Sequence, residues 1–207
     1  MKKLILFGLF ISIFALVSIG CAGEGKEGKG DIKMRNDKNP IVTLSTDFGD
    51  MTFELYRDVA PVHVDSFIAR TNDGFYDGLF FFRIVKNFMI QCGDPNNNGT
   101  GGAGYNLDAE FSDLPHIEGT LSMARGRSEN SAGTQFFVCL ARNQSTEYLD
   151  GKYTVFGQML SGNDVLQKIG AVSVEPQPLS GEKSHPKEPI HLKKAYMSDV
   201  EGNPLKE

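Results

Sequence analysis

Residues 81–94, FFRIVKNFMIQCGD, place a single arginine, Arg83, in a segment that otherwise has the pattern of two buried strands around Lys86-Asn87. A guanidinium keeps its charge at any physiological pH and carries five hydrogen-bond donors in a rigid fork. Surrounding that group with Phe, Ile and Met side chains is costly unless it has a partner or a function. The segment is therefore typical of a shallow apolar groove with one strong donor directed into it.

Outward from this segment, the chain reads mostly as short strands. We expect strands at 41–48, 51–56, 79–85, 88–92, 120–124, 135–140, 154–160 and 190–197, and helices at 60–70 and 163–169. The segments 93–118 and 173–189 are rich in Gly, Asn or Pro and are expected to be loops. Many short strands with two helices suggest a closed antiparallel barrel, although the strand pattern alone favours a barrel over a sandwich only weakly.

The composition is that of one ordinary globular domain with appendages. The chain has 207 residues, of which 40% are hydrophobic, and its fifteen Phe with no Trp predict a core built on Phe. The formal net charge is −5. This argues against nucleic acid as the main partner, because a phosphate-binding surface needs clustered positive charge.

The first twenty residues have the pattern of a targeting segment. Two lysines precede an apolar run at residues 4–19, which is shorter than the about 20 apolar residues of a membrane span. The run ends before Cys21 in a way that resembles a bacterial lipoprotein signal, which would leave Cys21 acylated at the new N-terminus. Ser18 departs from that pattern, in which Leu is usual. Ordinary secretion and a retained membrane anchor remain the alternatives.

The sequence divides into three parts that are expected to differ in structure and processing. We predict a lipoprotein signal peptide at 1–20, a flexible tether at 21–39 that is rich in Gly, Lys and Glu, and a folded domain at 40–207. The predicted location is the exported side of a membrane, periplasmic or at the cell surface. The outer membrane is favoured over the inner one because Ala22, rather than Asp, follows the cysteine.

The two remaining cysteines, Cys92 and Cys139, lie in apolar segments that read as strands. Free cysteine is among the most buried residue types, so two buried thiols are the default expectation. A disulfide stays open for an exported protein, because the sequence does not give the geometry that a disulfide requires. Neither cysteine has a neighbouring Cys or His at ligand spacing, so no metal site is predicted.

Five separated blocks, in one order, resemble the cyclophilins, the peptidyl-prolyl cis-trans isomerases. They are FFRIVKNFMIQCGD (81–94), NGTGG (98–102), GTLSMAR (119–125), SAGTQFFVCL (131–140) and YLDGKYTVFGQ (148–158). The resemblance covers residues 40 to about 198. It implies a mainly β fold, a closed eight-stranded antiparallel barrel capped by two helices. It also implies an isomerase that acts on proline-containing polypeptides; we further expect a monomer.

The isomerase reaction sets simple chemical requirements. Rotation about an X-Pro bond takes tens of seconds or longer without a catalyst, and it makes or breaks no covalent bond. No nucleophile, metal or cofactor is needed. A donor directed at the prolyl nitrogen helps the twisted transition state and does little for the planar ground state. We assign this role to Arg83, and the resemblance implies catalytic roles for Gln91 and Phe88 beside it.

The resemblance also implies the residues that hold the substrate. Gln91 and Gln135 would orient Arg83 and the substrate backbone. Tyr148 and Tyr153 stand where well-studied eukaryotic members carry Trp and His, which puts cyclosporin binding in doubt more than catalysis. The full set of expected substrate-binding residues is Met89, Ala124, Arg125, Gln135, Phe137, Tyr148, Leu149 and Tyr153.

Other interpretations of these residues remain open from the sequence. Arg83 could be a structural ion-pair partner on a barrel wall, and Phe88, Met89 and Phe137 could be ordinary core residues. The same groove could also serve a non-catalytic, proline-peptide-binding surface lipoprotein that acts as an adhesin or scaffold. Chain order alone does not exclude a Ser-His-Asp triad, but the sequence contains no nucleophile elbow.

Overall fold

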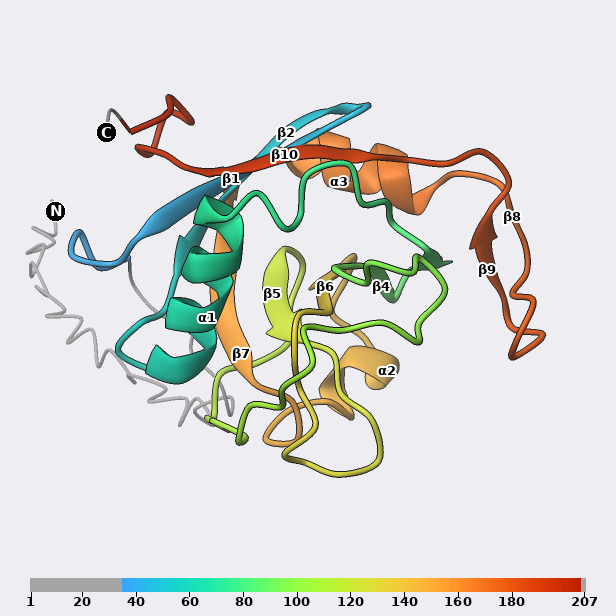
Figure 1. The fold of residues 1–207 in the computed structure, drawn as a ribbon, viewed down its shortest axis with the longest axis horizontal. Coiled ribbons are helices and arrows are strands. Elements are labelled where there is room, and N and C mark those ends of the chain that lie inside the picture. The colour runs from blue at the N-terminus through green and yellow to red at the C-terminus, as the bar shows by residue number, and fades with distance from the viewer. Residues whose placement is uncertain (1–34, 206–207) are drawn as a thin grey trace, which may run out of the picture.

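The computed structural model of the protein describes residues 35–205 (Figure 1). The predicted signal peptide at 1–20, Cys21 and most of the predicted tether lie outside these residues. Within residues 35–205, no helix is both long and apolar enough to cross a membrane.

Eight strands form one antiparallel sheet, in the order β10-β1-β2-β7-β5-β6-β4-β3. The strands are β1 (Ile41–Thr46), β2 (Gly49–Leu55), β3 (Arg83–Val85), β4 (Met89–Cys92), β5 (Thr120–Met123), β6 (Phe136–Cys139), β7 (Val155–Ser161) and β10 (Leu192–Met197). Figure 1 shows the sheet curving around the interior, with β1, β2 and β10 on one side and β4, β5 and β6 on the other. The architecture is a cyclophilin-like half-barrel.

The expected closed barrel is wrong in one respect, because the sheet is open between β3 and β10. The predicted strand at 79–85 pairs with β4 only over Arg83–Val85, since Gly78 has a left-handed φ of 78° and the segment after it is irregular. The backbone amide of Phe81 donates to the carbonyl of Ile190, and Phe80 forms one isolated bridge with His191. These contacts bring the two edges together without a continuous ladder.

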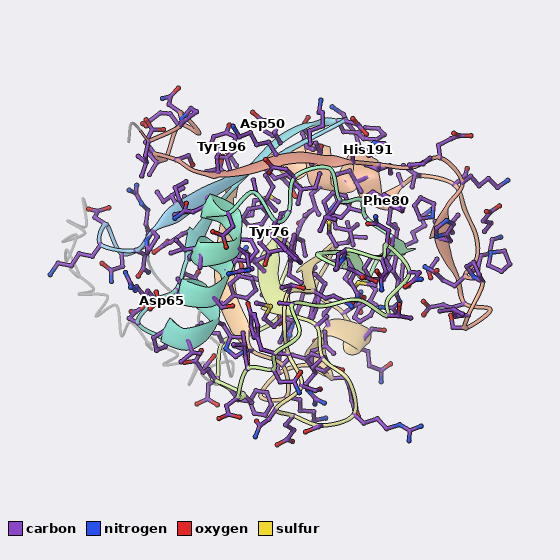
Figure 2. The ribbon with its side chains drawn as sticks, viewed as in Figure 1. Asp50, Asp65, Tyr76, Phe80, His191 and Tyr196 are labelled. Carbon is purple, nitrogen blue, oxygen red and sulfur yellow. The ribbon has the colours of Figure 1, made fainter. Side chains whose placement is uncertain are left out.

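In the described part of the chain, three helices accompany the sheet, α1 (Pro61–Asn72), α2 (Gln144–Glu147) and α3 (Asn163–Gly170). The predicted helices at 60–70 and 163–169 correspond to α1 and α3, whereas the short α2 was not expected. Pro61 suits the first turn of α1, because the amide hydrogen that it lacks would have no partner there. Phe67 lies on the buried face of α1 and contacts the ring of Tyr76, which is fully buried beside the helix (Figure 2).

The core is built on phenylalanine, as the composition predicts. Fully buried Phe side chains come from α1, from the strands and from the segment before β3: Phe53, Phe67, Phe81, Phe136 and Phe156. The ring of Phe67 meets those of Phe136 and Phe156 at centroid distances of 5.4 and 5.2 Å. The layer between α1 and the sheet is thus an aromatic cluster with near-perpendicular and tilted ring pairs.

The two cysteines of the sheet are buried free thiols, as expected. Cys139 lies opposite Met89 in the β4–β6 register, and Cys92 lies three residues further along β4. At about 3.3 Å per residue, this places the two cysteines too far apart for a disulfide. Burial raises the pKa of Cys92 to about 12.

The C-terminal segment 173–189 was predicted to be a loop, and this is wrong for its central part. It contains a two-stranded hairpin, β8 (Val174–Pro176) and β9 (Lys183–Pro186). Figure 1 shows this hairpin at the right-hand end of the molecule, beyond β4. It lies against β3, the edge strand that carries Arg83.

Candidate functional site

The β3–β4 hairpin divides its side chains between two faces. Ile84 and Ile90 point into the main core with α1, whereas Met89 belongs to a second apolar cluster on the other face of the sheet. Successive residues of a strand point to opposite faces. Arg83 and Gln91, which are paired directly across the two strands, therefore lie on the same face as Met89.

This second face forms a pocket of about 190 Å³. Its lining residues are Arg83, Phe88, Met89, Gln91, Ala124, Arg125, Phe137, Leu149 and Tyr153. The pocket therefore gathers all but two of the expected catalytic and substrate-binding residues. They come from β3, the turn between β3 and β4, β4, β6 and the segments that follow β5 and α2.

The floor of the pocket is apolar and mostly buried. The side chains of Met89, Phe137 and Leu149 are almost fully buried, and Phe88 packs against them from the turn between β3 and β4. The ring of Phe137 meets the edge of Tyr153 at a centroid distance of 6.0 Å. Such a surface suits a small aliphatic ring, because it offers contact area and no competing hydrogen bond.

A chain of amide side chains supports Arg83 from one side. Arg83 Nη1 donates to Gln91 Oε1 over 3.2 Å, and Gln91 Nε2 donates to Gln135 Oε1 over 2.9 Å. Gln135 Nε2 in turn donates to the carbonyl of Gly101 over 2.8 Å. The guanidinium is thus linked through two glutamines to the 98–102 loop.

A carboxylate that the sequence interpretation missed supports Arg83 from the other side. Glu182, on the turn that precedes β9, accepts from Arg83 Nε over 2.6 Å and from Arg83 Nη2 over 2.8 Å. The hydrogen bond from Arg83 holds the pKa of Glu182 below its usual value. Arg83 is therefore both a pocket residue and an ion-pair partner, two interpretations that the sequence left as alternatives.

Beneath the pocket floor, a serine, a histidine and an aspartate do lie in contact. His116 Nδ1 lies 3.0 Å from Asp150 Oδ1, and His116 Nε2 lies 3.0 Å from Ser122 Oγ. Ser122 is fully buried and donates to the carbonyl of Thr154, so its oxygen is not open to a substrate. His116 stacks on Phe137 at 5.9 Å, which makes this group a support for the floor.

Two expected site residues lie outside the pocket lining. Gln135 lines a neighbouring, larger cavity of about 630 Å³, together with the 98–102 loop and the β8–β9 turn. The Tyr148 side chain is 68% exposed, and its ring is covered by Lys152 Nζ at 3.6 Å from the centroid. Tyr148 follows α2 directly and does not line this pocket, so its expected role in substrate binding stays a prediction.

A second arginine, Arg125, lies at the edge of the pocket and is held by contacts with Tyr153 and Lys152. The guanidinium carbon of Arg125 lies 4.5 Å from the ring centroid of Tyr153, and Arg125 Nε donates to the carbonyl of Lys152 over 3.1 Å. Arg125 and Ala124 line both the pocket and the larger cavity. The two cavities therefore adjoin along this edge and along Arg83.

Comparisons with known proteins agree with this geometry. The sequence model of the family described as "Cyclophilin type peptidyl-prolyl cis-trans isomerase/CLD" matches residues 41–197. A peptidyl-prolyl cis-trans isomerase of Synechococcus elongatus is 44% identical over 115 residues, covering 56% of this chain and 77% of the relative. Peptidyl-prolyl cis-trans isomerase-like 1 of Emericella nidulans is 41% identical over 145 residues, covering 67% of this chain and 87% of the relative.

Solved structures give the same result. The crystal structure of a cyclophilin-type peptidyl-prolyl cis-trans isomerase of Cryptosporidium parvum is similar with a TM-score of 0.71 and 28% identity, covering 78% of this chain and 98% of that one. A structure of the same protein in the presence of the dipeptide Ala-Pro has a TM-score of 0.70 and 29% identity, covering 77% and 99%. This chain belongs to the family of the cyclophilin-type peptidyl-prolyl cis-trans isomerases.

Proposed function

We propose that this peptidyl-prolyl cis-trans isomerase is tethered to a membrane and accelerates X-Pro rotation in exported or surface proteins. The observation that carries the isomerase site is the position of Arg83, whose guanidinium stands at the rim of an apolar pocket of about 190 Å³. The observation that carries the tether is the apolar run at 4–19 followed by Cys21.

In the proposed mechanism, the proline ring enters the pocket and Arg83 acts on the rotating amide. As the bond twists, the prolyl nitrogen loses its resonance and becomes basic, so that a positioned donor stabilises it. A hydrogen bond to a charged group contributes about 1.5–3 kcal/mol. At about 1.4 kcal/mol per factor of ten, this is roughly ten- to 150-fold in rate.

The remaining acceleration comes, in this proposal, from binding and desolvation. Phe88, Met89, Phe137 and Leu149 hold the ring in an environment poor in water, where the charge of Arg83 acts more strongly. Gln91 keeps the guanidinium in place, and Gln135 offers a polar group to the substrate backbone at the entrance to the larger cavity. Ala124, Arg125 and Tyr153 form the edge along which the peptide lies.

The proposed location follows from the N-terminal sequence. Acylation of Cys21 would hold the chain on the exported side of a membrane, in our proposal the outer one, and residues 22–39 would give the domain reach. The partners would be flexible X-Pro segments, bound by a monomer without a cofactor and without nucleic acid. Mass spectrometry of the mature N-terminus tests the lipid directly, because a diacylated or triacylated Cys21 supports it and an unmodified terminus contradicts it.

A proline-peptide isomerisation assay with the full chain tests the activity. The expected result is a rate that rises in proportion to protein concentration and is absent with heat-denatured protein. Peptide binding without any acceleration would instead support the alternative, a non-catalytic binding lipoprotein. Light scattering of the same preparation tests the monomer, and a dimer would contradict it.

A further inference from the structure

The β8–β9 hairpin brings a carboxylate from the C-terminal part of the chain to the guanidinium of Arg83. Glu182 and Arg83 are 99 residues apart in the sequence, yet they form two hydrogen bonds of 2.6 and 2.8 Å in a bidentate arrangement. Only 30% of the Arg83 side chain and 40% of the Glu182 side chain are exposed. Bidentate pairing of this kind fixes the plane of a guanidinium as well as its position.

The carboxylate is itself held in place by the hairpin. Ser184 is fully buried, and its hydroxyl donates to Glu182 Oε2 over 2.7 Å. Just after β8, the side-chain Nε2 of Gln177 donates to the carbonyl of Phe82 over 2.5 Å, and the backbone amide of Gln177 donates to the carbonyl of Glu182 over 2.8 Å. The hairpin is thus attached to the residue that immediately precedes Arg83.

The pairing keeps Glu182 off the pocket side of the guanidinium. Glu182 engages Nε and Nη2, whereas Nη1 faces Gln91 Oε1 at 3.2 Å and the sulfur of Met89 at 3.7 Å. Met89 is part of the pocket floor. Glu182 lines the larger cavity and does not line the pocket, so it holds Arg83 from the side opposite the proposed proline site.

We propose that Glu182 is a positioning residue for the isomerase reaction, which clamps Arg83 through Nε and Nη2 and thereby aims Nη1 at the amide in the pocket. Glu182 and Gln91 together fix the guanidinium from two directions, so that little rearrangement is needed when the amide twists. Preorganised donors of this kind act on the transition state more than on the bound ground state. The inference rests on the proposed catalytic role of Arg83.

The test compares Glu182→Ala and Glu182→Gln with the wild-type full chain in an X-Pro peptide exchange assay by NMR line-shape analysis, which separates turnover from affinity. We expect kcat/KM to fall about 3- to 10-fold in Glu182→Ala, a modest loss because the pair is partly exposed. The loss is expected in kcat, with KM changed less than about twofold. Glu182→Gln, which keeps one acceptor oxygen, is expected to recover part of the rate.

Two further measurements distinguish positioning from a purely structural role. In an Arg83→Lys background, whose ammonium cannot form the bidentate pair, Glu182→Ala is expected to change kcat/KM by less than about twofold. The Arg83 Nε–H resonance, assigned by its loss in Arg83→Lys, is expected to be protected from exchange in the wild type and to lose that protection in Glu182→Ala. Glu175→Ala removes an exposed carboxylate from the same hairpin and is the matched control, expected to leave activity unchanged.

Each outcome has a defined meaning. An unchanged or increased rate in Glu182→Ala, with active wild type, overturns the inference; an increase would identify the pair as an inhibitory clamp instead. An equal loss in the Arg83→Lys background also overturns it, because Glu182 would then act independently of Arg83. An inactive wild type would contradict the proposed function itself, which is a separate failure.

Discussion

Arg83 and Gln91 lie directly opposite each other on β3 and β4, and Arg83 Nη1 donates to Gln91 Oε1 over 3.2 Å. The pairing follows from the strand register, because two side chains facing each other across an antiparallel pair are close enough to interact. The catalytic donor proposed here is thus oriented by the strand next to its own. The turn at Lys86-Asn87, in which Asn87 has a left-handed φ of 60°, sets that register.

Replacing Gln91 tests the row of side-chain hydrogen bonds that links Arg83 through Gln91 and Gln135 to the 98–102 loop. Gln91→Leu leaves Arg83 Nη1 and Gln135 Oε1 without their partner, and we expect kcat/KM to fall about 5- to 20-fold while the fold is retained. The measurement is the peptide isomerisation rate with a thermal melt as the check on folding. Gln144→Leu, an exposed glutamine at the start of α2, is the control. Equal rates for both variants and the wild type would argue against a role of these side-chain hydrogen bonds in catalysis.

Truncation of Phe137 tests the pocket floor. Phe137→Ala is expected to lower the free energy of unfolding by about 3 kcal/mol, the low end for a buried Phe, because one side of the ring already faces the pocket. It is also expected to raise KM several-fold, since the ring supplies much of the apolar contact. Urea denaturation and steady-state kinetics are the measurements. The milder Phe137→Leu should raise KM with less loss of stability, and an unchanged KM in both variants would contradict the assignment.

The buried His116 predicts a pH dependence of stability. Burial lowers the pKa of His116 from 6.5, against the opposing effect of its hydrogen bond to Asp150, so its protonation favours the unfolded state. The stabilising contribution is therefore complete above about pH 6.5 and is lost as the pH falls toward the folded-state pKa, by at most about 1.4 kcal/mol per pH unit. Urea unfolding between pH 7.5 and 5 measures this. His116→Gln is expected to flatten the slope, and an unchanged slope would contradict the prediction.

The thiols of the sheet predict a simple labelling result. In a Cys21→Ser chain, Cys92 and Cys139 are the remaining cysteines, and both are buried. Burial raises the pKa of both thiols, which keeps them in the unreactive protonated form. We expect no maleimide adduct in the native state and two adducts after unfolding, measured by intact mass. Rapid native labelling would show that this part of the sheet opens.

The β3–β4 hairpin could be predicted from the sequence because its signal is local, whereas the apolar pocket floor was expected only from the resemblance to the cyclophilins. Alternating apolar residues on both sides of Lys86-Asn87 specify two short strands, and the burial of a lone Arg83 among them indicates a site. The buried thiols of Cys92 and Cys139 follow from the same apolar segments. Residues that are close in sequence or share one strand period leave a readable pattern.

The open sheet edge and the β8–β9 hairpin could not be predicted, because each depends on contacts between distant segments. The segment 173–189 is rich in Pro and polar residues, which is typical of a loop, and its strands are only three and four residues long. The pairing of Glu182 with Arg83 joins residues 99 apart, with no local pattern to indicate it. Tyr148 was expected among the substrate-binding residues by resemblance, and it directly follows the short α2, outside the pocket lining.

Arg83→Ala removes the proposed catalytic donor itself, and its effect is measured as kcat/KM for an X-Pro peptide in the full chain. The substituted protein is compared with Arg57→Ala, which removes an exposed arginine paired with Asp65 on α1. If Arg83 is the catalytic donor, Arg83→Ala loses at least tenfold in kcat/KM, with the melting temperature changed little and the Arg57→Ala rate unchanged. An Arg83→Ala protein that is folded and as active as the wild type would contradict this role.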